Sequence, residues 1–240
     1  MTTPRLLTAV ALLYVLLTSA CNHPALLLDA NADNLHTARN VAAAFYAQYG
    51  KELNLKDEPF VTIGVEGGQG YSYDIAHNVL FVTPFSQADF DTQKIFAKAC
   101  AEDRAATVYD ELMFGFFTAH QLMHLVYDEL PLTHVDEYEE ELRINTLTWL
   151  FLERNKLLPG ITEEHLAAYQ ALSAQLERRF PSLQRGDNAA TLPVEDNASY
   201  WYVTAASLQA SYAAAAQVGS PTAYVAALET RTVSVDAATH

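Results

Sequence analysis

Apolar residues recur at helical spacing between Asn34 and Tyr49, the first part of the chain with a clear periodic pattern. The apolar residues three or four positions apart are Leu35, Ala38, Val41, Ala42 and Phe45. This period places them on one face of an α-helix, and we expect that face to be buried. Asn31 or Asp33 is the expected N-cap, and Gly50 is the expected end of the helix.

A short β region follows this helix. The β-branched and aromatic residues from Phe60 to Val65 predict a strand, and the glycine-rich residues 66–70 predict a loop. Two further apolar runs, Tyr71 to Asp74 and Asn78 to Val82, predict a hairpin. The predicted β content is therefore small and lies early in the chain.

From Asp89 onward the apolar periodicity and the capping residues predict helices almost exclusively. The expected segments are Thr92 to Cys100, about Ala105 to Tyr127, Asp136 to Asn155, Thr162 to Phe180, Ser199 to Gln217, and a last short helix. The pattern as a whole predicts an α+β protein that is mostly helical, with a small N-terminal β-sheet.

The amino terminus has a charged start, an apolar run from Leu6 to Leu17 and then the residues Thr18-Ser19-Ala20-Cys21. The run is too short to span a bilayer as a helix, and this order of segments resembles a bacterial lipoprotein signal. The resemblance implies a signal peptide at residues 1–20, a tether at 21–33 and one domain at 34–240. It also implies an exported protein, in the periplasm or at the cell surface, held to a bacterial membrane by lipid on Cys21. An ordinary signal peptide with a chance cysteine is the alternative.

Composition narrows the classes of protein that fit. Half of the residues are hydrophobic, which is enough for one sizeable buried core. The formal net charge is −15, which argues against nucleic acid as a partner because a phosphate backbone requires clustered cations. Cys100 is the only cysteine besides Cys21, and we interpret it as a small buried residue.

Two histidines in the long predicted helix are candidate metal ligands. His120 and His124 are four residues apart, so both project from one helix face and can bind the same ion. The pair alone is weak evidence, because the chain has eight histidines and such spacings arise by chance. The acidic start of the next helix adds Glu141, and zinc commonly takes two imidazoles and one carboxylate.

The run from Phe116 to Leu152 resembles the gluzincin pattern of metallopeptidases, in which HExxH on one helix is followed by ExxxD on the next. It is most similar to an uncharacterised family of bacterial metallopeptidases, whose leucine-proline loop is matched by Leu130-Pro131. The resemblance implies a zincin-like fold that binds Zn²⁺. The implied site residues are the zinc ligands His120, His124 and Glu141, with Asn145 at the position of an outer-shell aspartate. It also implies that the hairpin Tyr71–Val82 is the edge along which a peptide or protein segment lies.

Two residues depart from this pattern. Gln121 stands at the position of the general base, and Asn145 stands where the family has aspartate. An amide can orient a zinc-bound water, but it cannot accept a proton, and losing a positioned base typically costs about 10²- to 10⁴-fold in rate. We therefore expect a zinc-binding, metallopeptidase-like protein whose hydrolysis is impaired. The alternatives are an active zinc peptidase with an atypical site and a metal-free structural or peptide-binding lipoprotein.

Several residues remain as alternatives around this site. Glu140 replaces Glu141 if the helix phase is shifted, and His134 offers a third imidazole from the loop between the helices. An aromatic cluster offers either a hydroxyl that stabilises an oxyanion or ordinary core packing. Its members are Tyr200, Trp201, Tyr202 and Tyr212.

Overall fold

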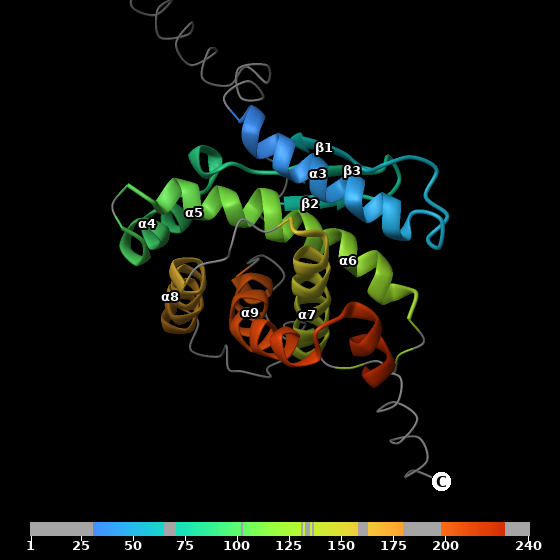
Figure 1. Ribbon diagram of the computed structural model, residues 1–240. Helices are drawn as coiled ribbons and strands as arrows, with labels where there is room; N and C mark the ends of the chain where they lie inside the picture. Colours follow the sequence, from blue (N-terminus) through green and yellow to red (C-terminus); the bar gives the residue numbers. More distant parts are fainter. Residues whose placement is uncertain are drawn as a thin grey trace, which may run out of the picture.

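A computed structural model describes residues 31–64, 71–101, 103–130, 132, 135, 137–157, 163–179 and 198–228 (Figure 1). The early elements are α3 (Ala32–Tyr49), β1 (Phe60–Ile63), β2 (Tyr71–Asp74), β3 (Val79–Val82), the 3₁₀ turn η2 (Phe85–Gln87) and α4 (Phe90–Ala99). The later elements are α5 (Ala105–Glu111), the π-helical segment η3 (Leu112–Phe117), α6 (Thr118–Asp128), α7 (Glu137–Asn155), α8 (Glu163–Arg179), α9 (Ala198–Val218) and a short helix at 221–228. The signal and lipidation predictions, Cys21 included, lie outside the described residues. Among the helices described, none has the length and apolar character that a membrane span needs.

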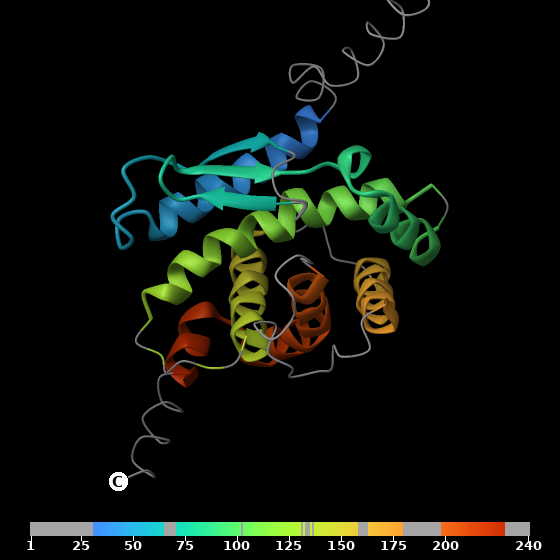
Figure 2. The same cartoon turned by 180° about the vertical axis from the view of Figure 1, so that it is seen from behind.

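The elements form three layers around one long helical rod. Figures 1 and 2 show α5, η3 and α6 running end to end across the middle of the molecule. The sheet and α3 lie on one side of this rod, and α7, α8 and α9 lie on the other side. The rod is therefore packed from both sides. The structure is mostly helical with a small sheet, which confirms the expected α+β class.

The three described strands form one sheet in the order β1-β3-β2. β2 and β3 pair antiparallel, with Tyr71 opposite Val82, so the predicted hairpin is confirmed. β1 pairs with β3 in parallel, with Phe60 opposite Val79, and this places the second hairpin strand at the centre of the sheet. The pattern of the sequence did not predict this parallel pairing, because strand order depends on contacts between distant segments.

The buried face of α3 agrees with the predicted face. Its buried residues are Leu35, Ala38, Val41, Ala42 and Phe45. Asn31 is at the N-cap position but makes no side-chain capping bond. Gly50 ends the helix in a right-handed conformation, with φ −56°. A Cβ there would lie 2.6 Å from Tyr46 Cδ2, so glycine is needed for close packing against that ring.

The long helix predicted from Ala105 to Tyr127 is present, but its middle is not α-helical. Residues 112–117 form the π-helical segment η3, and all six are buried. Thr118 Oγ1 donates to Met113 O at 3.3 Å, a partner five residues back in the chain. A π-helical insertion rotates the helix that follows it relative to the helix before it. The orientation of α6 therefore depends on η3.

The later helices agree with the prediction within two residues at each described end. The last long pair is held together in the core, where Trp149 Nε1 of α7 donates to Ser211 Oγ of α9 at 3.0 Å. Both side chains are buried. Cys100, at the end of α4, is buried as expected.

Candidate metal centre

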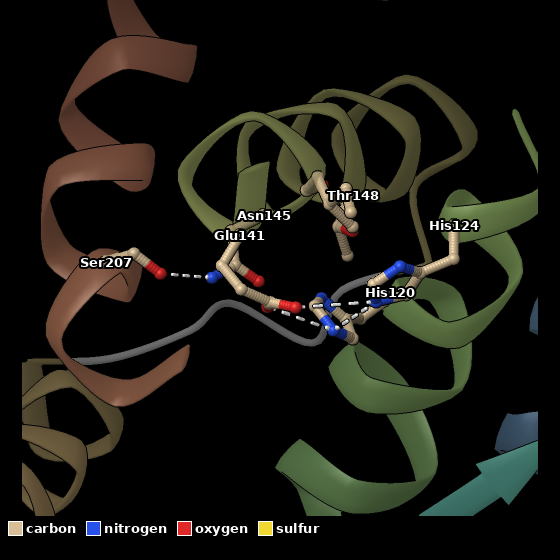
Figure 3. A network of polar contacts seen from close by, with 7 residues as sticks. His120, His124, Glu141, Asn145, Thr148 and Ser207 are labelled. Carbon is tan, nitrogen blue, oxygen red and sulfur yellow. Dashed lines mark hydrogen bonds and ion pairs between the residues drawn. The ribbon is translucent and has the colours of Figure 1, made fainter. Parts of the chain in front are cut away.

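His120 and His124 lie one turn apart on α6 and face α7 (Figure 3). Their ring centroids are 4.8 Å apart, the planes are almost perpendicular at 88°, and the two Nε2 atoms lie 3.2 Å apart. Helical spacing alone puts both rings on one face. The perpendicular arrangement turns the same ring nitrogen of each histidine toward a common point.

Aromatic packing fixes the position of the first imidazole. His120 is fully buried, stacks on Phe116 at a centroid distance of 6.2 Å and meets the ring of Phe117 at 5.7 Å. Trp149 of α7 packs against Phe116 at 4.4 Å. These rings keep water away from one side of the cluster. His124 is more open, with 26% of its side chain exposed.

Glu141 reaches both histidines from α7. Its Oε2 lies 3.4 Å from His120 Nε2, and its Oε1 lies 3.6 Å from His124 Nε2. The carboxylate is almost entirely buried, with 4% of its side chain exposed. Ligand atoms of the three residues all lie within 4.8 Å of one another.

The separations of these atoms can be compared with those in a metal site. Around a tetrahedral zinc ion with bonds of about 2.0–2.2 Å, neighbouring ligand atoms lie roughly 3.3–3.6 Å apart. The three contacts of 3.2, 3.4 and 3.6 Å are close to this range, with the two histidines contacting different oxygens of Glu141. The buried group of His120, His124 and Glu141 could therefore hold a metal ion.

The protonation state of the histidines also suits a metal. Burial lowers the pKa of His120 well below its usual range, and the nearby His124 lowers it further. Burial lowers the pKa of His124 to about 4. Both imidazoles are therefore neutral at pH 7, and the neutral imidazole is the form that coordinates metals.

Asn145 lies one turn after Glu141 on α7, between the histidines and α9 (Figure 3). It is fully buried, and its Nδ2 donates to Ser207 Oγ at 2.8 Å (Figure 3). The side chain of Asn145 acts to raise the pKa of His120. An interaction with that effect favours the protonated ring, so the amide oxygen of Asn145 is the end that faces the imidazole, while Nδ2 faces Ser207. The outer-shell role of Asn145 stays a prediction.

Three other residues were predicted to belong to the site or to be alternatives in it: Gln121, Glu140 and His134. Gln121 follows His120 on α6, about 100° around the helix, and is partly buried; its role in place of a base stays a prediction. The phase of α7 turns Glu141 toward the histidines, whereas Glu140 lies partly exposed beside it. His134 lies outside the described residues.

The predicted aromatic cluster is only partly described. The side chains of Tyr200, Trp201 and Tyr202 are outside the described set. Tyr212 is 42% exposed, and its ring meets that of Trp149 at 5.2 Å. Its observed contact is therefore aromatic packing on α7, and an oxyanion role has no support at this position.

Two contributors to the site were not expected. One is η3, which sets the rotation of α6 and carries Phe116 and Phe117 against His120. The other is Ser207, which bonds Asn145 across 62 positions of sequence. A possible signal for Ser207 was the presence of serines at 207 and 211, four apart in an alanine-rich helix, since they form a polar stripe on one face.

Comparison of the chain with protein-family models, with curated proteins and with solved structures gave no match. The geometry of the centre and the motif are therefore the features that indicate a function.

Proposed function

We propose that this protein is a zinc-binding, metallopeptidase-like protein with a zincin-like fold, in which hydrolysis is impaired or absent. The observation that carries the proposal is the convergence of three ligand groups, His120, His124 and Glu141, at contacts of 3.2–3.6 Å. The donor set favours zinc over calcium or magnesium, because those ions prefer oxygen ligands alone. Two neutral imidazoles and one carboxylate leave a fourth position for water or another ligand.

The identities of the nearby amides support the loss of hydrolysis. Zinc in such a site acidifies a coordinated water when it is bound. A peptidase also needs a group that accepts the water's proton, and Gln121 and Asn145 are amides that cannot do so. Gln121 retains the ability to orient a water by hydrogen bonding, so a slow peptidase is the second candidate.

The edge of the sheet supports a peptide as the partner. Among the described strands β2 is an outer strand, and it contacts α6, the helix of the two histidines. An outer strand offers main-chain donors and acceptors to an extended peptide. We propose that such a segment lies along β2, the outer strand of the hairpin Tyr71–Val82, and that lipid on Cys21 holds the protein at a bacterial membrane.

Zinc content and zinc affinity of the purified protein test the proposal. The wild-type protein should contain close to one zinc per chain, and His120→Ala should lose it. His165→Ala is the matched control, because His165 is also buried and contacts a glutamate, Glu111, at 2.7 Å on other helices. The control should keep its zinc.

If the three side chains form a polar cluster without a metal, the opposite results are expected. The three side chains already contact one another, so they can also serve as a polar cluster in the core. In that case the wild type contains no zinc, added zinc does not raise its melting temperature, and His120→Ala and His165→Ala differ only in stability. This result would exclude the zinc proposal.

The substitution Gln121→Glu tests the assignment of a disabled enzyme. It restores a carboxylate at the base position and should raise the hydrolysis of a mixed fluorogenic peptide library by about 10²- to 10⁴-fold. The double variant His120→Ala/Gln121→Glu is the control and should show no gain. No gain in a Gln121→Glu protein that binds zinc would mean that substrate positioning is also lost.

A further inference from the structure

Two parallel hydrogen bonds connect α7 to α9 in the core. Asn145 and Trp149 are four residues apart on α7, and each donates to a serine of α9. The partners, Ser207 and Ser211, are also four residues apart, and the bonds measure 2.8 and 3.0 Å. All four side chains are buried. The two bonds are similar in geometry but differ in what lies beyond them.

Only the first bond leads to the candidate metal centre. Beyond Asn145, in the same buried polar network, lies the imidazole of His120, whose pKa the side chain of Asn145 acts to raise (Figure 3). Beyond Trp149 lie the rings of Phe116 and Tyr212, at 4.4 and 5.2 Å. A change at Ser207 can therefore reach a ligand through polar groups, whereas a change at Ser211 reaches His120 only indirectly, through the packing of Trp149 and Phe116.

An asparagine at this position needs a partner that an aspartate would not need. Both oxygens of a carboxylate accept hydrogen bonds, so either orientation serves a histidine N–H. An amide has one accepting end and one donating end, and the flipped amide would direct its N–H₂ group toward the imidazole. The orientation of Asn145 thus decides whether it supports or opposes the donor nitrogen of His120.

Ser207 provides the means of selecting that orientation. The hydroxyl of a helical serine commonly donates to a carbonyl of the preceding turn, as Ser211 does to Leu208 O at 2.7 Å, and its lone pairs are then left to accept. An accepting hydroxyl attracts Nδ2 of Asn145 to the side of α9 and leaves the amide oxygen on the side of His120. In a metal-bound histidine, a hydrogen bond at one ring nitrogen determines which nitrogen faces the metal, and the amide oxygen of Asn145 is on the side that can accept it.

We infer that Ser207 is a positioning residue of the metal centre, acting through the amide of Asn145 on His120. The inference rests on the proposed function, since it concerns the affinity of the same site. Loss of an outer-shell partner typically lowers metal affinity by about 10- to 100-fold. Ser207 is one bond further away, so its loss should weaken zinc binding by roughly three- to tenfold.

The test measures zinc affinity in competition with a chelating indicator. Ser207→Ala should weaken binding by roughly three- to tenfold. Ser211→Ala, the matched control, should stay within about twofold of the wild type even where both variants lower the melting temperature. Ser207→Thr retains the hydroxyl and should bind zinc with an affinity close to that of the wild type. The absorption spectrum of the Co²⁺-loaded protein should shift in Ser207→Ala and not in Ser211→Ala.

A double-mutant cycle separates positioning from general stability. In an Asn145→Ala background, Ser207→Ala should have no further effect on affinity, because the connecting amide is absent. In an Asn145→Asp background its effect should also shrink, because a carboxylate accepts in either orientation. If Ser207→Ala does not fold, Ser207→Cys keeps the volume with a poorer acceptor and should give the same decrease.

The outcomes distinguish the inference from the proposed function. Equal affinities of wild type, Ser207→Ala and Ser211→Ala would overturn the positioning role and leave zinc binding intact. Equal losses in both serine variants, or an undiminished Ser207→Ala effect in the Asn145→Ala background, would also overturn it. A wild-type protein that binds neither Zn²⁺ nor Co²⁺ would overturn both the inference and the function beneath it.

Discussion

The protein buries two histidines against glutamates in two different ways. Between α5 and α8, His165 Nε2 meets Glu111 Oε2 at 2.7 Å, and Arg104 Nη2 lies 4.0 Å from the same oxygen. Between α6 and α7, the atoms of His120 and Glu141 are 3.4 Å apart. The first distance is that of a direct hydrogen bond. The second is the spacing expected when both atoms bind one ion, and this difference distinguishes a structural pair from a candidate metal centre.

The two carboxylates also differ in how exposed they are and in which charged groups surround them. The side chain of Glu111 is 33% exposed, so water and Arg104 share in stabilising its charge. Glu141 is almost fully buried and faces two imidazoles that are neutral at pH 7. A metal ion bound between these groups would place a positive charge directly beside the buried carboxylate.

The largest expected effect comes from neutralising each glutamate in turn. Glu141→Gln removes the charged ligand and should weaken zinc binding by at least about 100-fold, beyond the loss seen for outer-shell partners. Glu111→Gln should leave zinc affinity unchanged and lower the free energy of unfolding by about 1 kcal/mol, because the pair is partly exposed. Calorimetric titration with zinc and chemical denaturation measure the two effects. Similar zinc affinities in the two variants would remove the distinction between the pairs.

Zinc itself should stabilise the fold through the centre between α6 and α7. At a free zinc concentration 100 times the dissociation constant, the free energy of unfolding should rise by about 2.7 kcal/mol. Thermal melts with zinc and with a chelator measure this change. The rise should persist in His165→Ala and vanish in His120→Ala.

A third carboxylate, which is partly buried, extends the comparison to pH. Asp110 accepts from Phe85 N at 2.7 Å and from Asn34 Nδ2 at 3.2 Å, and burial raises its pKa to about 6. The folded state therefore holds this proton more tightly than the unfolded state. Stability should increase as the pH falls through 6, by about 1 kcal/mol between pH 7 and pH 5.

Asp110→Asn provides the control for this pH dependence. Its amide does not titrate, so urea unfolding of the variant at pH 7 and pH 5 should lack the Asp110 contribution. An identical change in stability in wild type and variant would show that Asp110 has an ordinary pKa in the folded protein.

The smallest expected effect concerns two glycines, one within η3 and one directly after β1. Gly115 in η3 is buried, and a Cβ there would meet nothing within 4 Å, so Gly115→Ala should stabilise the protein by about 0.5–1 kcal/mol. At Gly64 a Cβ would lie 2.5 Å from Phe81 Cδ1, so Gly64→Ala should destabilise it. Thermal melts compare the two variants. Destabilisation by Gly115→Ala would mean that the π-helical segment itself requires glycine.

Local periodicity predicted most of the helices and their buried faces. α3 shows this most directly, since its five buried residues are the five apolar positions at helical spacing. The hairpin from β2 to β3 was predictable for the same reason, because its pairing partners are close in sequence. The parallel pairing of β1 with β3 was not, because it joins segments on either side of another strand.

The sequence alone determined that His120 and His124 share a helix face, because the geometry of an α-helix puts residues four apart on one side. It also determined that amides stand at positions 121 and 145. The tertiary structure decided which carboxylate meets the histidines, how η3 rotates them and that Ser207 supports Asn145. These features depend on packing between α6, α7 and α9, and the spacing of residues within one helix carries no information about the helices that pack against it.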